Sequence, residues 1–172
     1  MREAEAPWAS LSSRVIHVAM AREGCSYARL IDTLAEAGVD EAERPLIARV
    51  SRGSVKFTLL LQIIQVTEAC PPPLWADALA LQGTWEARAQ AVMAAELAPQ
   101  PWVTPSELVR RLAMIGVVIS EKTLTMHLSA GTFSLSLFLQ CVTVLRSSSL
   151  DIYLEFRALV AAATQGLASP VD

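Results

Sequence analysis

The sequence predicts an all-helical protein, built as two tandem copies of one small unit of about five helices each that pack together as a pseudo-dimer. Two observations carry this prediction. The 172 residues are 53% hydrophobic and 18% charged, and alanine and leucine dominate while alternation of β-branched residues is scarce. The second observation is that the sequence repeats itself at a fixed distance, which is a sign of duplicated architecture.

The repeat becomes visible when the chain is shifted by 78 residues, which aligns residues 26–66 with residues 104–144 without a gap. Thirteen of these 41 positions are identical, among them Leu30/Leu108, Gly38/Gly116, Gly53/Gly131 and Gln62/Gln140. The match extends outward, because Trp75 falls on Tyr153, and Trp8 falls on Trp85 once a one-residue insertion near Trp102 is allowed. Similarity of this length in one register indicates a duplication.

The boundary between the copies is expected where Gln82 and Gly83 interrupt the helical pattern, which gives units at residues 1–81 and 82–172. A unit of this size is at the lower limit for a helical core of its own. We therefore expect the two units to bury part of their apolar surface on each other. The recurring aromatic positions are expected to be core anchors.

The first unit begins with a predicted helix over residues 7–23, whose apolar residues recur at helical spacing and which Gly24 ends. Ser26 is a good N-cap for a second helix that stops at Gly38.

A third helix begins at Asp40 or Glu43 and ends at Gly53, with Pro45 tolerated because it lies in the first turn. A fourth helix is expected over residues 55–69, and the prolines at 71–73 start a short fifth helix. The second unit repeats this order, with Thr104 and Ser120 as N-caps and Gly116 as a stop.

Three segments of the first unit carry a family resemblance: residues 27–39 (YARLIDTLAEAGV), residues 46–53 (LIARVSRG) and residues 59–62 (LLLQ). They resemble the helix-turn-helix domains of the phage-repressor/Cro type. The stretch SRG, followed by a Phe-containing LLQ helix, is also similar to a bacterial family of uncharacterised domains distantly related to that group. The resemblance covers residues 26–66 and 104–144, and the turn over residues 38–46 is longer than in the standard pattern.

The resemblance implies a cytoplasmic bacterial regulator of transcription whose third helix enters the major groove of double-stranded DNA. In the first unit the outward candidates for contact are Arg44, Arg49, Arg52 and Lys56. They are the four charged residues between Arg44 and Thr67, a segment without any acid in a chain of net charge −3. The competing interpretation is an ordinary solvated helix face, and interruption of the positive face by Glu41 and Glu43 would favour it.

In the second unit the corresponding candidates are Lys122, Thr123 and His127, while Arg52 and Lys56 are replaced by Ala130 and Ser134. We therefore expect this unit to be a degenerate DNA-binding half or a surface for self-association. The alternative function for the whole chain is a protein-interaction module that has lost DNA binding. Its partner would then be another protein or a second copy of the chain.

The sequence shows no motif for catalysis or for metal or cofactor binding. No Cys/His spacing fits zinc and no phosphate-binding loop or nucleophile motif is present, so we expect neither a metal, nor a cofactor, nor an enzyme. The three cysteines, an odd number without paired spacing, are expected to be reduced and mostly buried. The apolar runs are shorter than the roughly 20 residues of a membrane span, and the first residues lack a secretory pattern, so a cytoplasmic location is expected.

Overall fold

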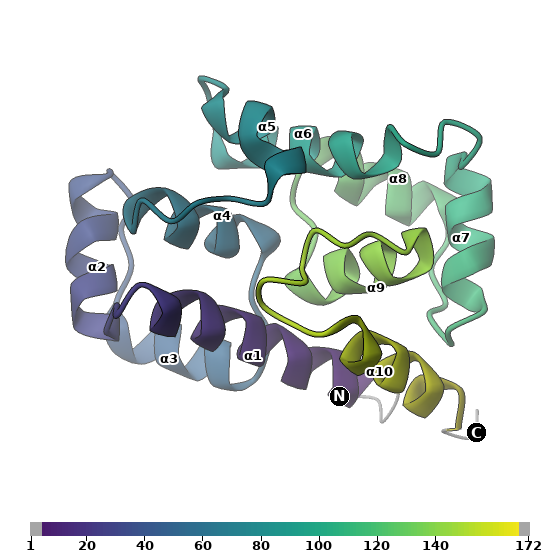
Figure 1. Cartoon of the computed structure of the whole chain (residues 1–172), viewed down its shortest axis with the longest axis horizontal. Coiled ribbons are helices and arrows are strands. Elements are labelled where there is room, and N and C mark those ends of the chain that lie inside the picture. Colours follow the sequence, from purple (N-terminus) through teal and green to yellow (C-terminus); the bar gives the residue numbers. More distant parts are fainter. Residues whose placement is uncertain (1–4, 169–172) are drawn as a thin grey trace.

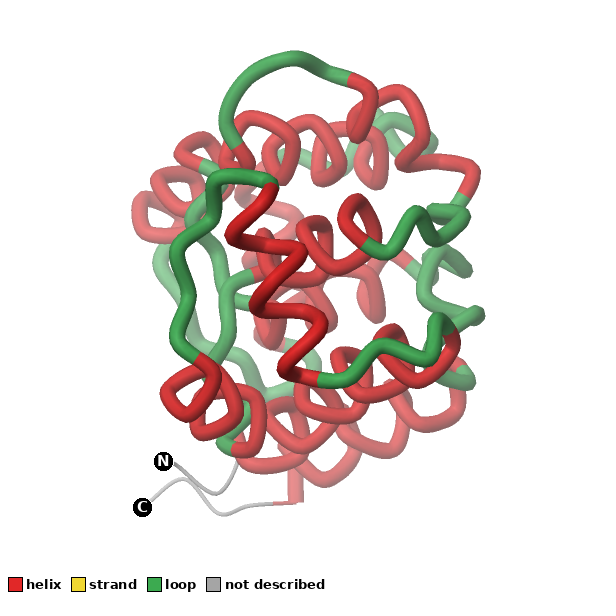
Figure 2. Tube along the Cα trace, turned by 90° about the vertical axis from the view of Figure 1, so that its left-hand side faces the viewer, coloured by secondary structure: helices red, strands yellow, loops and turns green. Residues whose placement is uncertain are grey.

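The computed structural model describes residues 5–168 and confirms the all-helical fold class, because no strand occurs within that range. Figure 1 shows the arrangement of the helices, and Figure 2 shows the course of the loops that join them. In the first unit the elements are α1 (Ala6–Arg22), α2 (Tyr27–Glu36), α3 (Glu43–Ser51), α4 (Phe57–Val66), the 3-10 helix η2 (Pro73–Trp75) and α5 (Ala76–Ala80). In the second unit they are α6 (Trp85–Leu97), α7 (Pro105–Ala113), α8 (Glu121–Ala130), α9 (Leu135–Leu145) and α10 (Phe156–Ala168).

The predicted caps form locally as expected. The hydroxyls of Ser26, Thr104 and Ser120 accept hydrogen bonds from backbone N–H groups of the first turns of α2, α7 and α8. Gly38 and Gly116 follow α2 and α7 with positive φ angles of 78° and 80°, a conformation that glycine adopts without strain.

An approximate two-fold axis relates the two units. Lys56 and Ser134, which are equivalent in the repeat, form an isolated antiparallel bridge. The Phe57 N–H donates to the Phe133 carbonyl at 3.1 Å, and the Leu135 N–H donates to the Val55 carbonyl at 2.9 Å. Because a shift of 78 residues exchanges these two bonds, the axis passes between Lys56 and Ser134. It runs roughly along the line of sight in Figure 1, where α2 and α7 lie at opposite ends and α4 and α9 meet near the centre.

The units share helices across this axis. Helix α1 packs against α9 and α10 of the second unit as well as against α3 and α4 of its own, and α6 packs correspondingly against α4, α8 and α9. Tight contacts hold the first helix of each unit in place: a side-chain carbon at Gly53 would overlap the Ala9 carbonyl, and one at Gly131 would overlap the Glu86 carbonyl. The predicted pseudo-dimer is therefore a single interlocked body.

The core lies at the axis and is aromatic. Phe57 stacks on Phe138 with ring centroids 3.9 Å apart and on Phe133 at 5.4 Å. Trp75 meets Phe57 and Phe138 edge to face at 5.6 and 5.5 Å. These four side chains come from both units and are fully buried, so they tie the units together through the area they remove from water.

The repeated aromatic positions are core anchors, as the sequence predicts: Trp8, Trp75 and Tyr153 are buried and Trp85 is half-buried. The prediction of mostly buried cysteines is correct only for Cys141, because Cys25 is half-buried and Cys70 is exposed. Within residues 5–168 no helix combines the length and apolar character that a membrane crossing requires.

Candidate nucleic-acid interface

Helix α3 buries Leu46 and Val50 and turns Arg44 toward solvent. Arg52 follows at the C-cap and Lys56 precedes α4, and both are exposed. Lys56 lies at the two-fold axis through its bridge to Ser134. Three of the four cations predicted in the first unit are therefore open to solvent on α3 or directly after it.

Arg49 differs from these three because it is held by an acid. Its Nη2 lies 2.5 Å from Glu41 Oε2, and the two side chains are 40% and 22% exposed. Its Nε is buried and has no hydrogen-bond partner among residues 5–168. The turn before α3 thus neutralises one of the predicted cations. This is the interruption of the positive face by Glu41 that the competing interpretation of the sequence requires. Glu43, the other acid, is exposed beside Arg44.

A shallow groove of about 780 Å³ runs between α1 and the end of α3. Arg14 and His17 of α1 line one side and Arg52 the other. The groove is completed by the hydroxyls of Ser10, Ser13 and Ser51 and by small apolar residues, and none of its lining residues is acidic. It gathers cationic and hydroxyl donors on one surface of an acidic chain, which is the chemistry that binds phosphate groups.

His17 is held in position at this groove by Tyr27. The Tyr27 hydroxyl lies 3.1 Å from His17 Nε2, and the two rings meet edge to face. Burial raises the pKa of Tyr27, so its hydroxyl stays protonated. Ser13 Oγ lies 3.5 Å from the other ring nitrogen of His17. The sequence prediction missed Arg14 and His17, although the residues of α1 (APWASLSSRVIHVAMAR) include two arginines, one histidine and no acid.

The second unit lacks this groove chemistry. The positions equivalent to Ser10, Ser13, Arg14, His17 and Arg52 are Ala87, Gln90, Ala91, Ala94 and Ala130. Of the predicted residues, Lys122 is exposed, whereas the Thr123 hydroxyl accepts a hydrogen bond from the N-cap Ser120 at 2.8 Å. His127 is half-buried, and its Nδ1 has no hydrogen-bond partner among residues 5–168.

Helices α3 and α8 face the same side of the molecule. Both are drawn faint at the back of Figure 1, on opposite sides of the two-fold axis. Their N-termini carry acids as well as cations, because Glu43 and Glu121 are exposed beside Arg44 and Lys122. The arrangement therefore gives one face with two equivalent helices, of which only the first lies beside a cationic groove.

The fold and this face define a tandem all-helical protein in which two homologous units form an internal pseudo-dimer. The chain belongs to the family described as a domain of unknown function (DUF6471), whose model matches residues 8–70 and again residues 85–150. The double match confirms the two-unit organisation. No curated protein and no solved structure matches the chain in the corresponding comparisons.

Proposed function

We propose that the chain is a DNA-binding regulator of the helix-turn-helix kind, which holds double-stranded DNA on the face of its first unit. The observation that carries the proposal is the groove between α1 and α3, where Arg14, His17 and Arg52 gather without an acid. The resemblance to phage-repressor/Cro-type domains and the common face of α3 and α8 support it. Arg52 and Arg14 contact phosphates, while Arg44 and Lys56 extend the contact along α3 and toward the axis.

The second unit contributes less to this contact. Lys122 remains available on α8, but Thr123 is engaged in its helix cap and the groove arginines are absent. Arg49 contributes only when its ion pair with Glu41 opens. Binding therefore rests on the first unit, with the second unit holding α1 in place through α9 and α10.

Fluorescence anisotropy with a mixed-sequence duplex at two salt concentrations tests the proposal. The variant Arg14→Ala/Arg52→Ala should weaken binding, and the slope of log affinity against log salt should fall by about two, because each lost phosphate contact removes about 0.9 from the slope. The matched control is Arg110→Ala/Arg157→Ala, which removes two charges from side chains that are 63% and 85% exposed on the second unit. Absence of binding at low salt, or equal losses in both variants, would contradict the proposal.

A second candidate function, a protein-interaction surface on the second unit, is favoured by one observation. Met114, Val118 and Met126 are 62%, 93% and 56% exposed, whereas their equivalents in the first unit are Glu36, Asp40 and Ala48. Two of the three thus replace acids, and a cluster of exposed apolar residues is typical of a contact surface. Light scattering after size-exclusion chromatography distinguishes this candidate: the variant Met114→Glu/Val118→Asp should reduce a self-association that the native chain shows. A native chain that is monomeric at all concentrations would argue against self-association.

A further inference from the structure

In each unit, the chain that follows the fourth helix packs against the first helix of the other unit. The molecule therefore has two such places, which are equivalent in the repeat. They differ in how completely side chains fill them. At one place Trp75 is fully buried, and its indole N–H donates to Glu96 Oε1 on α6 at 2.6 Å. At the other place the equivalent residues are Tyr153 and Ala19. Both replacements are smaller, so the second place is not filled by the protein.

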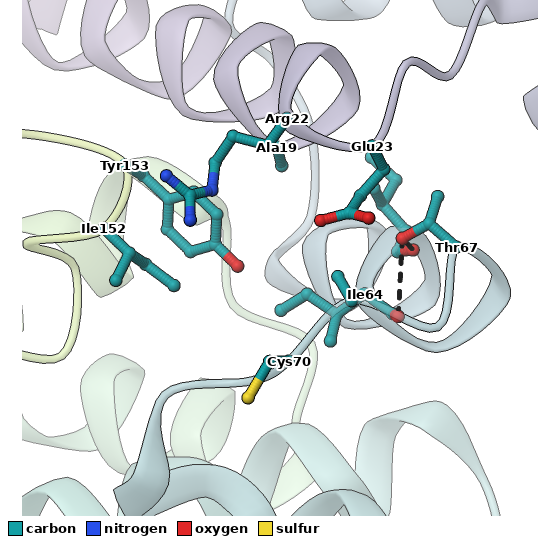
Figure 3. A pocket seen from close by; sticks show the side chains of 10 residues that line it. Ala19, Arg22, Glu23, Ile64, Thr67, Cys70, Ile152 and Tyr153 are labelled. Carbon is teal, nitrogen blue, oxygen red and sulfur yellow. Dashed lines mark hydrogen bonds between the residues drawn. The ribbon is translucent and has the colours of Figure 1, made fainter.

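A cavity of about 60 Å³ occupies this second place. Ala19, Ile63 and Ile64 form its apolar part, and Arg22, Glu23 and Tyr153 supply its polar groups (Figure 3). A single water needs about 10–15 Å³ of such space, so the cavity has room for about four to six waters. It therefore fits a small organic molecule of about five or six non-hydrogen atoms whose polar ends reach the opening.

The Tyr153 hydroxyl is the polar group that points to a ligand. Its side chain is buried, with 6% of its surface exposed, and in Figure 3 the hydroxyl points into the cavity. None of the side-chain hydrogen bonds found among residues 5–168 engages it, so the hydroxyl is free to bond a molecule in the cavity or at its opening. Burial raises the pKa of Tyr153 to about 12, with the Arg22 guanidinium opposing the shift and Glu23 and Cys70 adding to it. The hydroxyl is therefore a protonated donor that can also accept.

Two opposite charges flank the opening. Arg22 ends α1 and Glu23 is its C-cap residue, and neither takes part in a salt bridge among residues 5–168. In Figure 3 the guanidinium lies on the Tyr153 side of the opening and the carboxylate on the Thr67 side.

At the filled counterpart the two flanking positions are uncharged. The equivalents of Arg22 and Glu23 there are Pro99 and Gln100, and Gln100 Nε2 donates to the Leu145 carbonyl at 2.7 Å. Of the two equivalent places, the one that has the cavity is thus also the one that has the two charges.

We propose that this cavity binds a small α-amino acid, glycine or alanine. Its carboxylate is recognised by Arg22 and the Tyr153 hydroxyl, its ammonium group by Glu23, and its small side chain lies against Ile63 and Ile64. A cation and an anion that do not pair with each other match the two charges of a zwitterion, and the limited volume selects the smallest members of the class. The inference stands independently of DNA binding, because none of its residues lines the groove between α1 and α3.

Isothermal titration calorimetry of the full chain with glycine and L-alanine tests the inference. Both should bind saturably, whereas L-leucine should not bind because of its size. Tyr153→Phe removes only the hydroxyl and should weaken binding about tenfold. Tyr27→Phe, which alters the other of the two tyrosines, is the matched control and should leave amino-acid binding unchanged.

A second variant fills the cavity with the residues found at the equivalent place. Ala19→Glu/Tyr153→Trp introduces the residues that fill the equivalent place and should abolish binding while the thermal unfolding transition remains cooperative. If this variant does not fold, Tyr153→Phe and Arg22→Gln decide the question.

The inference would be overturned if neither amino acid gave saturable heat. It would also be overturned if the filling variant, or both single variants, still bound the amino acids as the native chain does. A third contrary result would be that acetate alone and methylamine alone each bind as well as the amino acids. The last result would mean that the site does not recognise a zwitterion.

Discussion

The two units of this protein have the same scaffold and different surfaces. Equivalent glycines meet equivalent backbone carbonyls, and equivalent backbone bonds cross the axis. On the surface, by contrast, Arg14 and Arg52 of the first unit are replaced by alanines, and Glu36 and Asp40 are replaced by Met114 and Val118 in the second. The shared core therefore restricts sequence change, whereas each outer face is free to diverge toward its own role.

The largest effect is expected when the units are separated. A chain of residues 1–81 loses α9 and α10, against which α1 packs, and exposes the buried surfaces of Phe57 and Trp75. We expect neither this fragment nor residues 82–172 to unfold cooperatively as a monomer, because the aromatic core needs side chains from both. Circular dichroism during thermal unfolding, with the mass measured by light scattering, checks this. A folded monomeric fragment would show that the units are independent domains.

A smaller effect is expected at the equivalent glycines. Gly53→Ala and Gly131→Ala should each destabilise the chain by more than about 3 kcal/mol, because a positive φ is combined with overlap of a neighbouring carbonyl. Gly38→Ala is the control, since its φ is 78° but no atom lies near the added carbon; it should cost about 1 kcal/mol. Chemical denaturation gives the three values. Unequal costs at Gly53 and Gly131 would mean that the two first helices are held differently.

The sequence was sufficient for the elements of the fold but not for their partners. Caps and stops such as Ser26, Gly38 and Ser120 act within a few residues, so local chemistry identifies them. The sharing of α1 could not be predicted, because an apolar stripe shows that a helix is buried without showing by what. Ser12, for example, is buried where its hydroxyl lies 2.9 Å from Ser136 Oγ, and its small size gives no sign of that contact.

The candidate site was predictable only in part, for a related reason. The run of cations from Arg44 to Lys56 is visible in the sequence because the residues are neighbours along the chain. The groove joins Arg52 to Arg14 and His17, which are more than thirty residues away and meet it only through the packing of α1 on α3. The cavity at Tyr153 needs residues from both units, so its existence follows from the exchange of helices.

The smallest expected effect concerns the ion-pair network of α7, which α2 lacks. Glu107 accepts hydrogen bonds from Arg110 Nε and Arg111 Nε, both at 2.8 Å, where α2 has Arg29, Asp32 and Thr33. The hydrogen bonds from Arg110 and Arg111 lower the pKa of Glu107 from 4.5 to about 2. A lowered pKa in the folded state stabilises the fold above the unfolded value, and this contribution is lost as the pH falls from about 4.5 to about 2.

Replacing this carboxylate therefore has an effect that depends on pH. Glu107→Gln should lower Tm by about 1–2 °C at neutral pH, because exposed ion pairs contribute little, and the difference from the native chain should vanish near pH 2. Asp32→Asn makes the same chemical change on α2, where no salt bridge occurs among residues 5–168, and should lower Tm less at neutral pH. Differential scanning calorimetry across this pH range measures both variants. A Glu107→Gln difference that is independent of pH would show that the side chain acts through packing, and the contrast between α7 and α2 would then not be electrostatic.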